Sequence, residues 1–148
     1  MPNSAPEYRL NLASYPLQLA MTTRYSDMDS YAHLNNGAIG RLYEDGRAKL
    51  HLEIHQDENF FRPDAIEKAL IIDCHIQYLA EGHFPDGVIT ATGIGRIGKT
   101  SYQIDQALFQ NQKCIGLCES IMVRTAEGKP SEIQGELRQR LEALLIKP

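Results

Sequence analysis

The chain has 148 residues, of which 43% are hydrophobic and 23% charged, and its net charge is −4. This length suits one domain, which can bury roughly 68–70% of its unfolded surface without disulfides or metal ions. The acidic balance gives no electrostatic reason to expect nucleic acid or an anionic membrane as a partner, so any phosphate contacts would come from local Lys or Arg.

A strand, a loop and a long helix are predicted first along the chain. Polar and apolar residues alternate over residues 17–25, which predicts a strand, and the polar segment 26–32 reads as a loop. Apolar residues then recur at helical spacing from 39 to 54, behind Asn35 or Asn36 as the cap. Three glycines weaken this helix by up to ~1 kcal/mol each, so we expect it to pack closely against a wrapping sheet. They are Gly37, Gly40 and Gly46.

The second half of the chain predicts a sheet and a closing helix. Residues 56–68 read as a loop or a short helix, and Ser131 is expected to cap a last helix that carries several apolar residues. Tight turns at 98–99 and 111–112 join the last three strands into a meander. The predicted strands cover residues 70–78, 88–97, 100–110 and 113–124. This order predicts an α+β fold, in which a helix covers one face of an antiparallel sheet.

Cysteine usage and the absence of long apolar runs predict a cytoplasmic protein. No stretch approaches the ~20 apolar residues of a membrane span, and Met1–Glu7 lacks the basic start and apolar run of a signal peptide. The three cysteines have no C-x-x-C spacing, which argues against disulfides and structural zinc. We expect all three to be buried in strands. They are Cys74, Cys114 and Cys118.

Two further motifs favour structural interpretations. The segment Gly93–Gly98 matches G-x-G-x-x-G, but it runs into a strand pattern at Thr100–Ile104 instead of opening a helix, so we attribute its glycines to sheet curvature. His51 and His55 lie one helical turn apart without the H-E-x-x-H order. We expect both to be solvated on the polar face of the helix.

The segment over residues 24–36 carries the strongest functional pattern. It places two carboxylates, a histidine and two amides in the loop that leads into the long helix. The free N–H groups of a helix start can bind a developing oxyanion, and a carboxylate beside them suits acyl transfer or hydrolysis. Ordinary turn and capping chemistry is the structural alternative.

The same segment carries a family resemblance. Its pattern Y-x-D-x-D-x-x-x-H-x-N-N over residues 25–36, followed by Leu42–Arg47, resembles the 4-hydroxybenzoyl-CoA thioesterase-like branch of the hot-dog superfamily. Weaker similarities at 77–81, 97–101 and 128–130 extend the resemblance over nearly the whole chain. It implies one hot-dog domain over residues 1–148, with an antiparallel sheet wrapped around a long central helix. It also implies homodimers with a continuous sheet and active sites at their interface, often paired into homotetramers.

The resemblance also implies roles for individual residues. Asp29, the second Asp of the D-x-D, would be the catalytic carboxylate, and Asp27 would be structural. The oxyanion donors would be backbone N–H groups around Asn35, Asn36 and Gly37. The substrate-binding positions would be His33, Asn35, Thr100 and Ser101, with Thr100 or Ser101 reaching in from the partner subunit. The family pattern calls for no metal ion or cofactor.

The implied activity is hydrolysis of an acyl-CoA thioester to a carboxylate and free CoA. Asp29 would act as a general base on water or attack the carbonyl itself. Glu44 is a second candidate, although its i,i+3 spacing to Arg47 favours a structural ion pair. The alternatives are a thioesterase for acyl-carrier protein and a non-catalytic acyl-CoA-binding protein. The cations available to CoA phosphates are Arg62, Arg96, Lys99 and Lys113.

Overall fold

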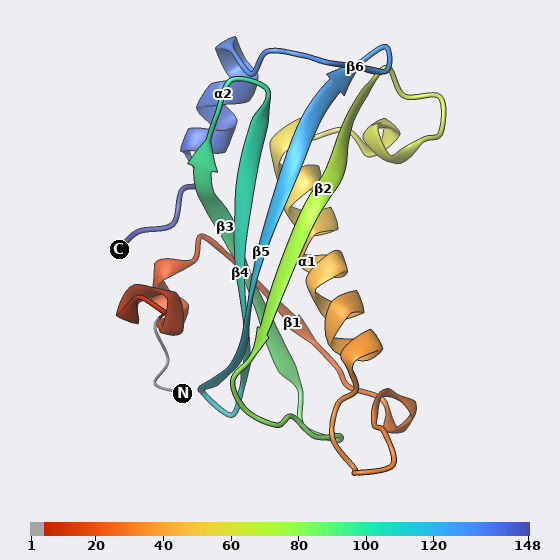
Figure 1. Cartoon of the computed structure of the whole chain (residues 1–148), viewed down its shortest axis with the longest axis vertical. Coiled ribbons are helices and arrows are strands. Elements are labelled where there is room, and N and C mark those ends of the chain that lie inside the picture. Colours follow the sequence, from red (N-terminus) through yellow and green to blue (C-terminus); the bar gives the residue numbers. More distant parts are fainter. Residues whose placement is uncertain (1–4) are drawn as a thin grey trace.

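The computed structural model describes residues 5–148, which form a curled antiparallel sheet with a long helix against its concave face (Figure 1). The strands are β1 (Leu17–Met21), β2 (Glu67–Tyr78), β3 (Val88–Ile97), β4 (Ser101–Gln110), β5 (Lys113–Ala126) and β6 (Lys129–Pro130). The helices are α1 (Asn36–His55) and α2 (Gly135–Glu142). The order across the sheet is β1-β3-β4-β5-β2, with β6 beside β5. The predicted α+β class and the wrapped helix are confirmed.

The strands β3, β4 and β5 form the predicted meander. The turn between β4 and β5 holds Asn111 and Gln112 at φ values of 51° and 66°, the left-handed pair that a two-residue hairpin of type I′ requires. The register of β3 against β4 shifts at Gly95, where an added Cβ would lie 2.4 Å from a carboxylate oxygen of Asp105. The G-x-G-x-x-G segment therefore lies in a bent strand, as its context predicted.

Helix α1 approaches the sheet most closely at Gly46. A Cβ there would lie 2.6 Å from the Thr90 side chain and 2.7 Å from Nε2 of Gln106. Nε2 of Gln106 donates a hydrogen bond to the main-chain oxygen of Tyr43, which ties the sheet to the helix. The expected close packing thus holds at Gly46. At Gly40, by contrast, an added Cβ would meet no atom within 4 Å.

The hydrophobic core follows α1 along the concave face of the sheet. One cluster surrounds the N-terminal half of the helix, and a second surrounds its C-terminal half and α2. Each large side chain that is fully buried contributes roughly 1.5–3 kcal/mol. The first cluster includes Leu34, Ile39, Leu42, Val88 and Leu108, and the second includes Leu50, Ile54, Ile94, Ile104 and Leu141.

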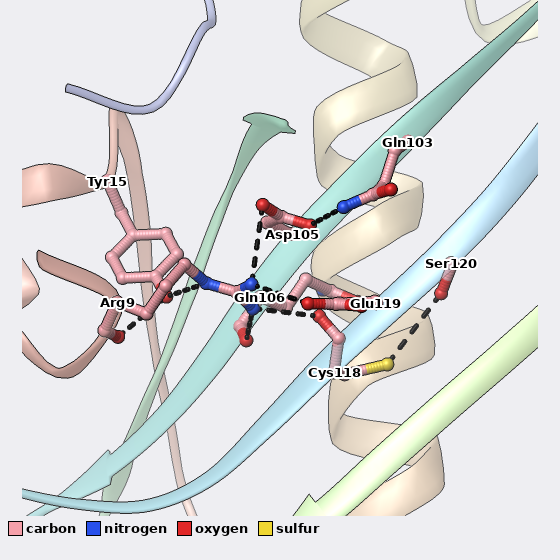
Figure 2. A network of polar contacts seen from close by, with 8 residues as sticks. All are labelled: Arg9, Tyr15, Gln103, Asp105, Gln106, Cys118, Glu119 and Ser120. Carbon is pink, nitrogen blue, oxygen red and sulfur yellow. Dashed lines mark hydrogen bonds and ion pairs between the residues drawn. The ribbon is translucent and has the colours of Figure 1, made fainter. Parts of the chain in front are cut away.

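The N-terminal segment 5–16 packs on the outer face of the sheet, where Arg9 lies in a buried polar cluster (Figure 2). Its guanidinium lies 2.9 Å from Glu119 and 3.4 Å from Asp105, and its Nε donates to the hydroxyl of Tyr15 at 3.1 Å. Burial raises the pKa of the Asp105 carboxyl above its usual value, although Gln103 and Arg9 oppose this. This cluster anchors the N-terminal segment to β4 and β5.

The two edges of the sheet differ. At one edge, the chain after α2 pairs with β3 beyond the end of β1, through hydrogen bonds of Ile94 with Leu144 and Ile146. At the other edge, β2 pairs with β5 on one side alone within the described residues. Three successive large apolar residues of β2 are 47–65% exposed. They are Leu70, Ile71 and Ile72. This edge is therefore open and apolar.

The ends of two predicted elements were wrong. The first strand ends at Met21 instead of residue 25, because residues Tyr25–Asp27 form a short 3-10 helix. The last helix begins at Gly135, and Ser131 does not cap it. The main-chain N–H of Ser131 donates to the carbonyl of Arg124, which keeps this residue on the sheet.

Two histidines that were predicted to be solvated lie inward, and one cysteine that was predicted to be buried is exposed. His51 is buried, with Nε2 2.7 Å from the Tyr102 hydroxyl, and the His55 ring stacks on Phe60 at a centroid distance of 3.9 Å. Both turn inward because the segment after α1 folds back over this flank of the helix. Cys74 is exposed because it lies on the open strand β2.

Residues 1–4 of the predicted domain, and that part of the segment judged for a signal peptide, lie outside the described residues. Within residues 5–148, no helix combines the length and apolar character that a membrane crossing requires.

Candidate functional site

The loop before α1 is closed by its own backbone. Met28 and Leu34 form an isolated antiparallel bridge, and the N–H of Asp29 donates to the carbonyl of His33 at 2.9 Å. Between them Ala32 adopts a left-handed φ of 61°, and its N–H donates back to the carbonyl of Asp29. These bonds fix the position of Asp29 relative to the start of α1.

The carboxylate of Asp29 is exposed and has one uncommitted oxygen. Its Oδ1 accepts the N–H of Tyr31 at 2.9 Å and that of His33 at 3.4 Å, the pattern of an Asx turn. Its Oδ2 accepts none of the hydrogen bonds found within residues 5–148. The turn therefore orients the side chain and leaves Oδ2 without a hydrogen-bond donor in this part of the chain.

Asp27 has a contrasting environment. It is 4% exposed, and its carboxylate accepts hydrogen bonds from the backbone N–H and the side chain of Arg24 and from the side chain of Arg41. Burial alone would raise the pKa of Asp27, but these donors outweigh it and hold the pKa below its usual value. Asp27 thus serves the structural role expected for the first Asp of the D-x-D.

The start of α1 offers two free donors. Asn35 caps the helix through a 2.8 Å hydrogen bond from the N–H of Ala38 to its side chain, and its own N–H donates to the carbonyl of Asp27 at 2.9 Å. In the part of the chain that is described, the N–H groups of Asn36 and Gly37 take part in no hydrogen bond. They also lie at the positive end of a 20-residue helix. The candidate oxyanion donors are therefore narrowed to these two groups.

His33 is turned toward the segment after β2. Its Nε2 lies 3.0 Å from a carboxylate oxygen of Glu81, and its ring meets that of His83 at a centroid distance of 5.3 Å. His83 in turn contacts the carbonyl of Ala32 through Nδ1 at 3.0 Å. Sequence reasoning gave Glu81 and His83 no part in the site, because nothing in a turn rich in Gly and Pro indicates which loop it will contact.

Thr100 and Ser101 lie far from the loop around Asp29 within one chain. Thr100 lies in the turn between β3 and β4, and Ser101 is the first residue of β4. This turn lies beside α2, whereas the loop around Asp29 lies at the opposite end of the sheet (Figure 1). Of the predicted site residues, the chain therefore brings together Asp29, His33 and the helix start. A contribution from Thr100 or Ser101 requires a second subunit.

The expected pairing of Glu44 with Arg47 is absent from residues 5–148. Glu44 is exposed, and Nη1 of Arg47 points under the helix, 3.1 Å from Oε1 of Gln106 and 3.4 Å from the hydroxyl of Ser120. Arg47 instead links α1 to the sheet. Both residues line a cavity of about 380 Å³ between α1 and β2. The prediction was wrong because the polar side chains of β4 and β5 compete with Glu44 for the guanidinium.

The four cations suggested for CoA phosphates lie at the surface. Arg62 pairs with Asp64 at 3.2 Å, and the side chains of Arg96, Lys99 and Lys113 are exposed. Within residues 5–148, no group of three or more His, Cys, Asp or Glu side chains is placed to hold a metal ion.

Residues 23–141 match the family model of the thioesterase-like superfamily. A predicted thioesterase from Bacillus stearothermophilus is similar, with 27% identity, a TM-score of 0.80, and coverage of 89% of this chain and 98% of that one. A thioesterase from Thermus thermophilus, solved with coenzyme A and zinc, has 20% identity, a TM-score of 0.79, and coverage of 91% and 98%. The latter likeness shows the fold, and no curated protein sequence gave a significant match.

Proposed function

Because the chain belongs to the thioesterase-like superfamily, we propose that it hydrolyses an acyl-CoA thioester to a carboxylate and free CoA, with Asp29 as the catalytic carboxylate. The family supports thioester hydrolysis as the chemistry. The observation that carries the assignment of residues is the combination at the start of α1. There one loop carries a carboxylate with an uncommitted oxygen and leads into a helix start with two unpaired backbone N–H groups.

In this mechanism the substrate carbonyl oxygen accepts hydrogen bonds from the N–H groups of Asn36 and Gly37. One such donor is typically worth ~10²–10³ in rate, because it stabilises the charge that develops on the oxygen. Oδ2 of Asp29 then takes a proton from the attacking water, or attacks the carbonyl carbon itself to form an anhydride that water opens. In either route the C–S bond breaks and CoA leaves as the thiolate.

We expect the active unit to be a homodimer or homotetramer in the cytoplasm. The open, apolar edge of β2 supports pairing with a second copy, which would extend the sheet. Such pairing would offer a route for Thr100 and Ser101 of the partner subunit to reach the substrate. The assembly and the location remain predictions.

The test is free-thiol release from a panel of acyl-CoAs by the wild type and by Asp29→Asn. Asparagine can keep the Oδ1 hydrogen bonds of the Asx turn but cannot take up a proton, so turnover should fall at least a hundredfold while the circular dichroism spectrum stays unchanged. Asp45→Asn, at an exposed position of α1, is the matched control and should keep wild-type activity.

Other outcomes of this test would change the assigned residue or the substrate class. Full activity of Asp29→Asn would overturn the assignment and make Glu44→Gln the next variant. Inactivity of the wild type toward every acyl-CoA, with hydrolysis of acyl-carrier protein, would shift the substrate class. Inactivity toward both would leave a binding protein.

A further inference from the structure

One face of α1 leads from the candidate oxyanion donors toward the middle of the molecule. Gly37, Gly40, Glu44 and Ala48 follow one another at intervals of three or four residues, so they lie on the same face of the helix. The space beside Gly40 is open, since an added Cβ would meet no atom within 4 Å. A chain that starts at Gly37 can therefore pass along this face without meeting a side chain at position 40.

The face ends in the cavity of about 380 Å³ that lies between α1 and β2. Its apolar lining includes aromatic residues from the segment after α1 and aliphatic residues from the strands. These residues are Ala48, Phe60, Phe61, Leu70, Ile71 and Met122. An exposed apolar lining of this kind favours an apolar occupant.

The polar residues around the cavity have partners elsewhere. Arg47 reaches beneath the helix, His51 is turned toward Tyr102, and Nζ of Lys68 donates to a backbone carbonyl at 2.7 Å. Arg62 pairs with Asp64. Their side chains line the cavity while their polar groups are engaged by these partners, and the exposed Glu44 can extend into solvent.

From these observations we propose that the acyl chain of the substrate runs along this face of α1 into the cavity, so that the preferred substrates are straight-chain acyl-CoAs of medium to long chain. This inference rests on the proposed function, because it starts the chain at Asn36 and Gly37. A helix rises 1.5 Å per residue, so Ala48 lies about 16 Å beyond Gly37. An extended chain covers ~1.2 Å per bond, which gives about 12–14 carbons.

The face of α1 from Gly37 to Ala48, together with the cavity, forms the proposed acyl groove. Two substitutions should shorten this groove by different amounts. Gly40→Leu places a branched side chain about four bonds from the thioester, and leucine is a better helix former than glycine. It should lower kcat/KM at least tenfold for dodecanoyl-CoA and leave butanoyl-CoA within about threefold. Ala48→Phe acts further along, so it should lower activity toward tetradecanoyl-CoA and spare octanoyl-CoA. Asp45→Leu, at an exposed position of α1 that does not line the cavity, is the matched control and should keep the wild-type profile.

A binding experiment separates this inference from the proposed function. Dodecyl-CoA and butyl-CoA thioethers cannot be hydrolysed, and the longer one should bind the wild type at least tenfold more tightly because it buries more methylenes. Gly40→Leu should abolish that difference. If the longer thioether binds more tightly but no thioester is hydrolysed, the acyl groove stands and the proposed hydrolase activity is wrong. Equal affinity for the two thioethers would overturn the proposal that the acyl chain lies in this groove. A Gly40→Leu chain-length profile like that of the wild type would overturn it too. The cavity would then be assigned to side chains of a second copy.

Discussion

The buried guanidinium of Arg9 gives a strong test of how the N-terminal segment is held. Arg9→Met should lower the free energy of unfolding by about 3–5 kcal/mol at pH 7, the usual cost of removing one partner of a buried ion pair. The structure supports the upper part of this range. Arg9 and Asp105 are both almost inaccessible to solvent, and the substitution also removes the hydrogen bonds that Arg9 donates to the main-chain oxygens of Gln106 and Cys118.

The loss should depend on pH in a defined direction. Without the guanidinium, the already raised pKa of Asp105 rises further, and an acid whose folded-state pKa is raised destabilises the protein above that pKa. Protonation removes this penalty as the pH falls. The difference in stability between wild type and variant should therefore shrink as the pH falls from 7 toward the pKa of Asp105.

Urea denaturation followed by far-ultraviolet circular dichroism measures this, since the chain has no tryptophan. Arg62→Met, which breaks an exposed pair with Asp64, is the control and should cost less than about 1 kcal/mol. A loss below about 1 kcal/mol for Arg9→Met, or one that does not change with pH, would refute the reasoning. Asp105→Asn on the Arg9→Met background should recover part of the loss.

Three further substitutions address the site and the helix. Asp27→Asn should cost about 2 kcal/mol near pH 7, because it weakens charge-assisted bonds to Arg24 and Arg41; since the pKa of Asp27 is lowered on folding, the difference should fade as the pH drops below 4 in urea titrations. Burial lowers the pKa of His51 to about 4, so wild-type stability should fall by about 3 kcal/mol between pH 6.5 and 4, and a smaller fall is expected in His51→Asn; equal falls would contradict this. Gly46→Ala should lower the midpoint of thermal unfolding by the equivalent of about 1–3 kcal/mol, because its Cβ would overlap the sheet, and an unchanged midpoint would mean that the helix shifts freely.

Periodicity and turn chemistry predicted most of the fold. The alternation in the last three strands, the two-residue turn at Asn111 and Gln112, and the helical spacing after Asn35 were each confirmed. These signals are local, because they depend on residues within a few positions of one another. The ends of the first strand and of the last helix were wrong where a side-chain hydrogen bond or a sheet contact overrode the local pattern.

Side-chain partners across the fold were harder to predict. The burial of His51 depends on Tyr102, which follows it by 51 positions, and Arg47 turns to Gln106 and not to its helical neighbour Glu44. Nothing in the first residues indicates that Arg9 would be buried. The candidate site depends less on such distant contacts, since Asp29 and the helix start are close in sequence and one loop contains them both. The roles of those residues remain predictions.

The unequal edges of the sheet have a consequence for how this protein should be handled. If a second copy pairs its own β2 with this β2, both copies use the same edge, so the contact closes the assembly instead of starting a fibre. Part of the folding free energy would then come from association. The melting temperature should rise with protein concentration, and highly dilute samples should expose the run at Ala69–Ile72, whose β-branched and aliphatic residues are prone to aggregate.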